Sequence, residues 1–236
     1  MRINIATLFP EMCEAVLDTS IIGRARNSGK VDIKTYNIRD YTLNKHRNVD
    51  DTPYGGGHGM VMQAQPVYDC CRVIAEESGS RPFVIFTTAA GKVFDQQLAR
   101  ELAQKENITI VCGHYEGIDE RIIEEIADME ISIGDFVLTG GELPALVITD
   151  AVCRMLPGVL KSEEGFTEES HFNGLLEHAQ YTRPYEWHGR TVPDVLLSGH
   201  EKNIKEYRKQ DSVNRTKLKR PDLYAKLFPE DNNVEK

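Results

Sequence analysis

Glycine-rich turns are the part of this sequence whose residue types and spacing could do chemistry. The stretch SIGDFVLTGGELPA, residues 132–145, joins an apolar run to a helix whose first turn is predicted by Glu142 and Pro144. A phosphate-binding P-loop needs a lysine after its glycines, and this stretch has none. Because Asp135 and Glu142 are acidic, we expect a neutral or cationic ligand held against bare backbone. The alternative is that Gly140–Gly141 form only a turn before the helix.

Two more glycine-bearing turns follow apolar runs in the same way. FTTAAG ends at Gly91, and VCGHYEGIDER contains Gly113, Glu116 and Gly117. In open α/β sheets, ligands bind outside the carboxyl ends of the strands. Three such turns at one edge of a sheet therefore predict a single small-molecule pocket.

The elements expected to position these turns alternate between strands and helices. Strands are predicted at 3–9, 31–38, 82–88, 107–113 and 129–134. Helices are predicted at 10–26, 66–77, 95–105, 119–127 and 142–156. Helices of this length between strands imply crossover connections, so we expect an α/β fold with a parallel sheet.

The alternation stops after residue 158, and this predicts a second domain. Residues 161–174 are polar and acidic, which is typical of a linker or a mobile loop. Only helices are predicted beyond them, at about 196–208 and 213–227. The expected organisation is an α/β domain at 1–160, an interdomain linker or lid at 161–175, and a small helical domain at 176–236.

The charge of the chain is unevenly distributed. The whole sequence carries a net −9, which by itself argues weakly against a nucleic-acid partner. Residues 202–220, however, hold eight basic residues and two acids, a net +6. That segment predicts either a patch for a polyanion or simply a solvated basic helix face.

The number and spacing of the cysteines and histidines indicate the cellular compartment and whether a metal site is expected. The five cysteines show no C-x-x-C spacing, which favours reduced thiols and a cytoplasmic protein. We expect no signal peptide and no membrane span, because no apolar run has the required length. The seven histidines show no H-E-x-x-H spacing, so we assign no metal ligands and discount a zinc hydrolase.

Six short blocks carry a resemblance to a known family. They are FPEM, VDDTPYGGGHGMVM, CGHYEGIDER, SIGDFVLTGGELPA, PGVL and YTRP. In this order, along nearly the whole chain, they resemble the bacterial tRNA (guanine-N1)-methyltransferases of the SPOUT class. The resemblance implies a deep trefoil knot in the first domain, a tRNA partner, and a homodimer whose active sites are each built from both subunits.

By resemblance, the glycine turns hold S-adenosyl-L-methionine, which carries a sulfonium cation and no phosphate. The implied cofactor-binding residues are Phe86, Thr87, Gly113, Tyr115, Glu116, Ile133, Gly134, Asp135, Phe136, Val137, Leu138, Gly140, Gly141 and Pro144. The family also links Glu116 to Mg²⁺ dependence. A divalent ion would offset charge near the carboxylates, although the sequence shows no dedicated metal cage.

The implied reaction is methyl transfer to the N-1 atom of the guanosine at tRNA position 37, beside the anticodon. A carboxylate must remove the N-1 proton, and an arginine must stabilise the charge on the 6-oxo group. Arg154 matches the family's catalytic arginine. The family's basic aspartate lies in a block like TEDSF, which here is TEESHF and places the base at Glu169. Glu168 is the open alternative, and both could belong to a solvated acidic linker.

The expected tRNA contacts lie in two segments. They are Asp50, Gly55, Gly56, Gly57 and Gly59 in a long loop predicted over the polar and glycine-rich residues 39–59, and Arg215, Lys217 and Arg220 in the basic segment. This chain departs from the family at His58, where proline is expected, and at TTAAG, where LSPQG is expected. Two rival functions are a related knotted methyltransferase with another target, and an RNA-binding protein without catalysis.

Overall fold

The structure is a computed structural model that describes residues 1–161, 166 and 169–230. The chain forms two compact units, Met1–Lys161 and Ser162–Lys236. The first unit ends one residue beyond the α/β domain expected from the sequence. The role of residues 161–175 as a linker or lid stays a prediction.

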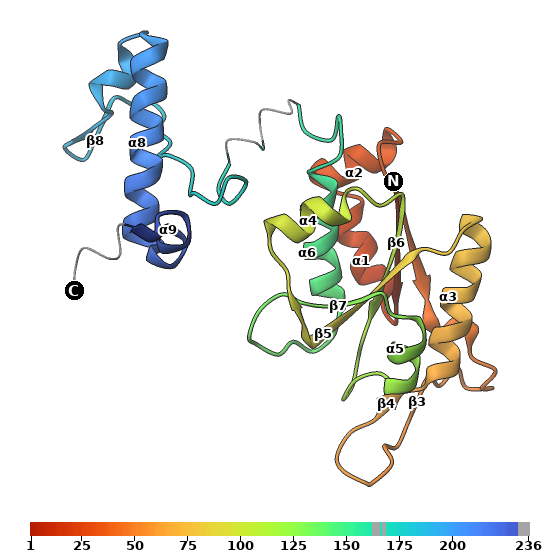
Figure 1. Ribbon diagram of the computed structural model, residues 1–236. Helices are drawn as coiled ribbons and strands as arrows, with labels where there is room; N and C mark the ends of the chain where they lie inside the picture. The colour runs from red at the N-terminus through yellow and green to blue at the C-terminus, as the bar shows by residue number, and fades with distance from the viewer. Residues whose placement is uncertain (162–165, 167–168, 231–236) are drawn as a thin grey trace. The chain divides into compact units, whose positions relative to one another are not determined.

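The first unit is built on five parallel strands (Figure 1). They are β1 (Arg2–Thr7), β2 (Asp32–Asn37), β5 (Phe83–Val93), β6 (Asn107–Cys112) and β7 (Met129–Ser132). Their spatial order is β2-β1-β6-β5-β7, and every neighbouring pair is parallel. The predicted α/β class with a parallel sheet is confirmed. The threading of a knot, which only the resemblance implies, stays a prediction.

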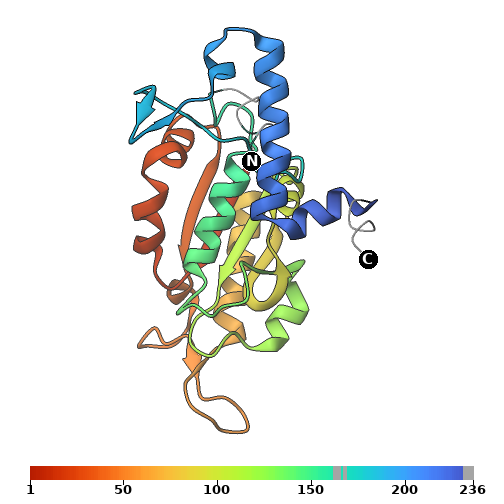
Figure 2. The ribbon, with the colours of Figure 1, turned by 90° about the vertical axis from the view of Figure 1, so that its left-hand side faces the viewer.

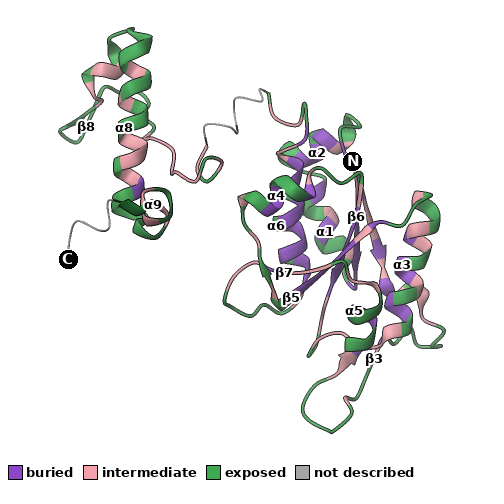
Figure 3. Cartoon of the chain, in the orientation of Figure 1, coloured by how far each residue is buried: buried purple, intermediate pink, exposed green. Residues whose placement is uncertain are grey.

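Helices cover both faces of this sheet. One face packs against α1 (Pro10–Leu17), α2 (Ser20–Asn27), α4 (Gln96–Leu102) and α6 (Glu142–Cys153). The other packs against α3 (Ala64–Ser78) and α5 (Glu120–Ile126). Because side chains alternate along a strand, Ile3 and Ile5 of β1 enter the first core and Ala6 enters the second. Figure 3 shows the buried strands between partly exposed helices, as expected for a sheet covered twice.

The helix expected over 10–26 is two helices. α1 ends at Leu17, and Ser20 then takes a left-handed φ of 55° before α2 continues. α2 packs closely on this connection, because a Cβ on Gly23 would lie 2.5 Å from the carbonyl carbon of Asp18. The sequence does not predict this break, because Gly23, which lies close to the backbone of Asp18, looks in the sequence like any weak helix former.

The strand expected at 82–88 continues to Val93 with an irregularity. Thr87 and Lys92 both pair with Ile131 of β7, so the residues between them bulge out of the ladder. Gly91 lies at this bulge, where an added Cβ would stand 2.5 Å from the backbone nitrogen of Ile131. Only a residue without a side chain fits there.

The long loop after β2 contains short regular elements. They are the 3-10 helix η1 (Ile38–Tyr41) and the antiparallel pair β3 (Asp50–Asp51) and β4 (Val61–Met62). Gly55, Gly56, Gly57 and Gly59, between the two strands, all have positive φ. Glycine is therefore the residue type that this backbone path requires.

The second unit is mainly helical, as expected, and it also contains a short hairpin that the sequence did not predict. It contains the hairpin β8 (Glu186–Trp187) and β9 (Arg190–Thr191), the 3-10 helix η2 (Asp194–Leu197), α8 (Glu201–Lys219) and α9 (Pro221–Leu227). The break expected near residues 209–212 is wrong. α8 continues through these residues. The polar side chain of Asp211 is used in packing, because it accepts a hydrogen bond from the Ala179 amide at 2.7 Å.

Candidate functional site

A cavity of about 400 Å³ lies where β5, β6 and β7 end. Its walls come from residues 87–90, 113–118, 130–134 and 136–141, with Glu120, Ile123 and Pro144. Residues from all three stretches singled out in the sequence therefore surround one cavity, but residues 87–90 belong to the bulge of β5 and Gly91 does not line the cavity. Its volume suits a cofactor-sized ligand.

Most of the residues expected to bind the cofactor line this cavity. Two of the fourteen do not. Phe86 is fully buried in the core beneath α3 and α5, and Asp135 is exposed to solvent. The sequence marks the turn but not which way each side chain points, and strand alternation turns Phe86 away from the cavity while Thr87 reaches it.

The charge of the cavity agrees with the expected ligand type. Among the described residues that line it, Glu116, Glu120 and Glu130 are acidic, and none is a lysine or an arginine. The Thr88 hydroxyl donates to the Glu130 carboxylate at 3.0 Å and fixes that side chain. Glu120 and Glu130 were missed in the sequence, although both lie within a few residues of the marked turns. The site favours a neutral or cationic ligand.

Two glycine turns touch through their backbones. The Gly141 amide donates to the Gly113 carbonyl at 2.8 Å, and His114 pairs with Gly140 as an antiparallel bridge. A Cβ on Gly141 would lie 2.7 Å from the Cα of Cys112 and 2.8 Å from the Gly113 nitrogen. Bare backbone is therefore needed because the turns are joined, besides leaving room for a ligand.

A buried carboxylate anchors this junction. Glu142, with 2% of its surface exposed, accepts from the Thr7 hydroxyl at 2.6 Å, and its other oxygen lies 2.9 Å from Nε2 of His114. Three strand and helix ends are thus tied together beside the cavity. In the sequence, Glu142 is only a helix-start signal, because nothing local predicts its distant partners.

Tyr115 links the cavity to the long loop. It has a left-handed φ of 60°, which is uncommon for an aromatic residue. Its hydroxyl accepts from the Arg39 guanidinium at 3.2 Å. The next amide, of Glu116, donates to the Met60 carbonyl at 2.9 Å, so the glycine loop and the cavity turn are held to each other.

Comparison with known proteins identifies the family. Residues 1–226 match the family described as tRNA (guanine-1)-methyltransferase TrmD. The chain belongs to this family. A tRNA (guanine-N(1)-)-methyltransferase of Ruminiclostridium cellulolyticum is 56% identical over 96% of this chain and 97% of its own. One of Clostridium botulinum is 55% identical over 99% of this chain and 97% of its own. The resemblance and the expected enzyme class, a tRNA (guanine-N1)-methyltransferase of the SPOUT type, are confirmed.

The catalytic residues expected in this family lie in different units. Arg154 is the C-cap of α6, whose other end is at the cavity. A helix of 12 residues is about 18 Å long, so Arg154 lies far from the cavity of its own chain. Glu169 lies in the second unit and is half-buried. Glu168, the alternative base, lies outside the described residues.

The residues expected to contact tRNA have varied surroundings. Asp50 lies on β3, and the glycines after it form an exposed loop. Arg215 donates to the Glu177 carbonyl at 3.1 Å, and Arg220 is paired with Asp222, at 2.6 Å between the closest atoms. Lys217 lies over the Tyr224 ring. These three cations therefore also stabilise the second unit.

Thiol and metal chemistry receive no support from the structure. All five cysteines are buried, and burial raises the pKa of the Cys13 thiol to about 12, so it stays protonated. Within the described ranges, no group of three or more His, Cys, Asp or Glu side chains could hold a metal ion. The expected Mg²⁺ dependence thus has no structural support. No helix in the described part of the chain is long and apolar enough to cross a membrane.

Proposed function

We propose that this protein transfers the methyl group of S-adenosyl-L-methionine to the N-1 atom of guanosine 37 in tRNA, in the cytoplasm. The observation that carries the cofactor assignment is the cavity at the strand ends, with three glutamates and, among its described lining residues, no cationic lysine or arginine. The tRNA substrate follows from membership of the family, and position 37 from the resemblance of the sequence blocks.

The residues present fit this cofactor. When bound, S-adenosyl-L-methionine supplies an electrophilic methyl group on a sulfonium cation. Glu116, Glu120 and Glu130 would favour that cation and repel a triphosphate. The glycines that line the cavity carry no side chain, so a flat ring could approach the backbone closely. The apolar part of the ligand would be held by Ile133, Phe136, Leu138 and Pro144.

In the proposed reaction Glu169 takes the N-1 proton of guanosine. As the proton leaves, negative charge builds on the 6-oxo group, and Arg154 donates hydrogen bonds to that oxygen. The freed N-1 lone pair would then attack the methyl carbon, and the sulfur–methyl bond would break with its electron pair left on a neutral thioether sulfur. A positioned carboxylate base contributes about 10²- to 10⁴-fold to the rate.

We further propose that the active unit is a homodimer with shared sites. Arg154 lies roughly 18 Å from the cavity end of α6, so it would act at the cavity of a second copy. α1 and α6 lie side by side (Figures 1 and 2) and carry an apolar patch whose members are 38–47% exposed. The patch consists of Phe9, Met12, Val16, Leu143 and Val147. A second copy of the chain would cover it.

The test is transfer of labelled methyl from S-adenosyl-L-methionine to an unmodified tRNA transcript, beside a transcript with adenosine at position 37. Label in the guanosine transcript alone supports the cofactor, the tRNA substrate and position 37 together. Equal label in both transcripts contradicts the position. No label in either, with cofactor bound, contradicts the reaction and favours an RNA-binding protein without catalysis.

A further inference from the structure

The segment Tyr181–Arg190 of the second unit presents large side chains to solvent. All ten of its residues are exposed. Trp187, the only tryptophan in the chain, has 63% of its surface exposed, and Tyr185 has 49%. Exposed aromatic side chains of this size on a folded element indicate a surface that binds a ligand or a partner molecule. We call Arg183, Tyr185, Trp187 and Arg190 the hairpin surface.

The hairpin surface is built on a defined scaffold. His188 and Gly189 both have positive φ, as a tight two-residue turn between β8 and β9 requires. This turn places Trp187 directly opposite Arg190. The base of the hairpin is fixed because the Val192 amide donates to the Tyr185 carbonyl at 3.0 Å. The rings are therefore held out by a structured element and need little ordering on binding.

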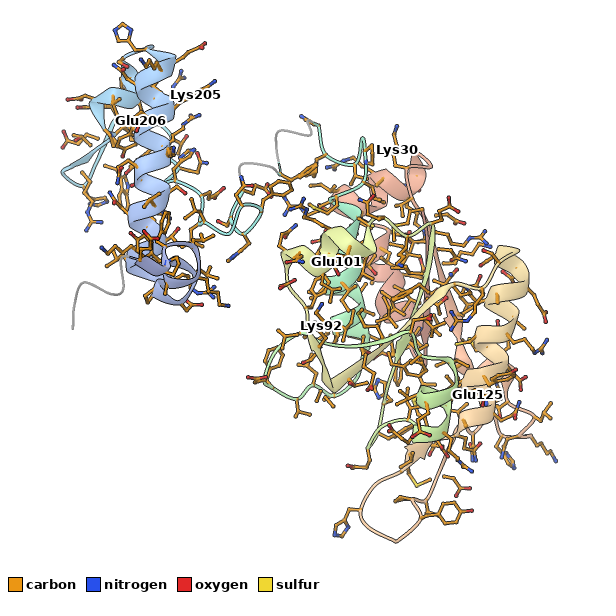
Figure 4. The ribbon with its side chains drawn as sticks, viewed as in Figure 1. Lys30, Lys92, Glu101, Glu125, Lys205 and Glu206 are labelled. Carbon is orange, nitrogen blue, oxygen red and sulfur yellow. The ribbon has the colours of Figure 1, made fainter. Side chains whose placement is uncertain are left out.

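The chemistry of this surface fits unpaired RNA. Its two aromatic rings lie between two guanidinium groups along the chain. Bases stack on aromatic rings, and phosphates pair with guanidinium groups. The same unit carries further exposed cations at helical spacing on α8, namely Lys202, Lys205 and Lys209. Figure 4 shows Lys205 and Glu206 on α8, so this helix face is mostly but not wholly basic. Lysines are depleted from the cores of protein–protein interfaces, so the lysines of α8 favour RNA over a protein partner.

We propose that the hairpin surface binds a single-stranded segment of RNA, with one base stacked on Trp187 and Arg190 on an adjacent phosphate. This rests on the proposed function, because the RNA is the loop of the tRNA substrate. A paired RNA stem has no free base that could stack on Trp187, so we do not expect it to bind this surface in the same way.

Because Trp187 is the only tryptophan, its fluorescence reports on this surface alone. The full-length chain is titrated with an anticodon stem-loop RNA and, separately, with a fully paired duplex of the same charge. We expect saturable quenching by the stem-loop and little by the duplex. Unchanged emission while the stem-loop binds and is methylated overturns the hairpin proposal but leaves the proposed function. Absence of both binding and methylation overturns both.

The dependence of Trp187 emission on protein concentration tests whether a second copy of this chain, and not RNA, covers the hairpin surface. If a second copy of this chain covers the hairpin, emission shifts to the blue as protein concentration rises without RNA, and later RNA causes no quenching. That result overturns the proposal. Emission that is independent of protein concentration, followed by quenching with RNA, supports it.

Variants test the energetic role. Trp187→Leu should weaken stem-loop binding by about tenfold or more, as loss of one stacked base does, and Trp187→Phe should retain most of the affinity. Tyr68→Leu on α3, at 37% exposure, is the matched aromatic control and should bind as the wild type does. Cofactor affinity should be unchanged in all three. Normal RNA affinity in Trp187→Leu contradicts the proposal.

Discussion

At the scale of single residues, Glu142 is the buried group on which the cavity wall depends. Its carboxylate accepts from both Thr7 and His114, whereas a glutamine has one accepting oxygen and must turn its amide toward one of them. We expect Glu142→Gln to lower the free energy of unfolding by about 1–3 kcal/mol and to weaken cofactor binding. Denaturant unfolding and calorimetric titration measure the two effects. Glu125→Gln, at an exposed site on α5, should change neither. Wild-type stability in Glu142→Gln would contradict this role.

The identity of the base is also decided at single residues. If Glu169 takes the N-1 proton, Glu169→Gln should lose at least about 100-fold in single-turnover methyl transfer while cofactor affinity is retained. Glu168→Gln is the matched neighbour and should remain active. The reverse pattern assigns the proton to Glu168, and near-normal turnover in both variants would reject a carboxylate base in this segment.

At the scale of elements, the sequence predicts each strand of the five-stranded sheet and most helices of the first unit, but not how they meet. Apolar runs and helix-start residues such as Pro10 and Asp95 are local signals, so they are visible in one sequence. The bulge between Thr87 and Lys92, and the approach of Gly91 to β7, depend on pairing between distant segments. The glycines that line the cavity could be predicted because they are a local signal. The buried hydrogen bonds beside it could not, because they join residues that are far apart in the sequence.

One tie between elements should give stability a dependence on pH. Glu14 of α1 accepts from Arg26 of α2 and from Thr35 of β2, and these bonds hold the pKa of its carboxyl below the ordinary 4.5. Because the folded-state pKa is the lower one, the stabilisation is complete above about pH 4.5 and is lost as pH falls through the folded value.

Glu14→Gln should therefore be less stable than the wild type by about 1 kcal/mol at neutral pH, since both partners are only partly buried. The difference should shrink when denaturant unfolding is repeated in acid. Glu11→Gln on the same helix is exposed and should show no such trend. A constant difference across the pH range would mean that packing, and not the charge, is responsible.

At the scale of the whole molecule, neither the sequence patterns nor one chain's geometry completes the active site. Arg154 is fixed to the far end of α6, and α6 is part of the rigid core around Ile148 and Val152. No rotation of its side chain spans the roughly 18 Å back to the cavity. The proposed symmetric pair, in which each chain serves the other's cavity, would account for both the apolar patch on α1 and α6 and the position of this arginine.

Mixing two inactive variants tests that arrangement. Arg154→Ala keeps an intact cavity. Gly141→Val keeps the arginine but distorts the cavity wall, because a Cβ there meets the backbone of Cys112 and Gly113. Each should be inactive alone. Co-refolded at equal amounts, half of the dimers carry both variants and have one complete site out of two, so methyl transfer should return to about a quarter of the wild-type rate. If subunit exchange is verified by mass and the mixture stays inactive, Arg154 does not serve the partner's cavity and the shared site is rejected.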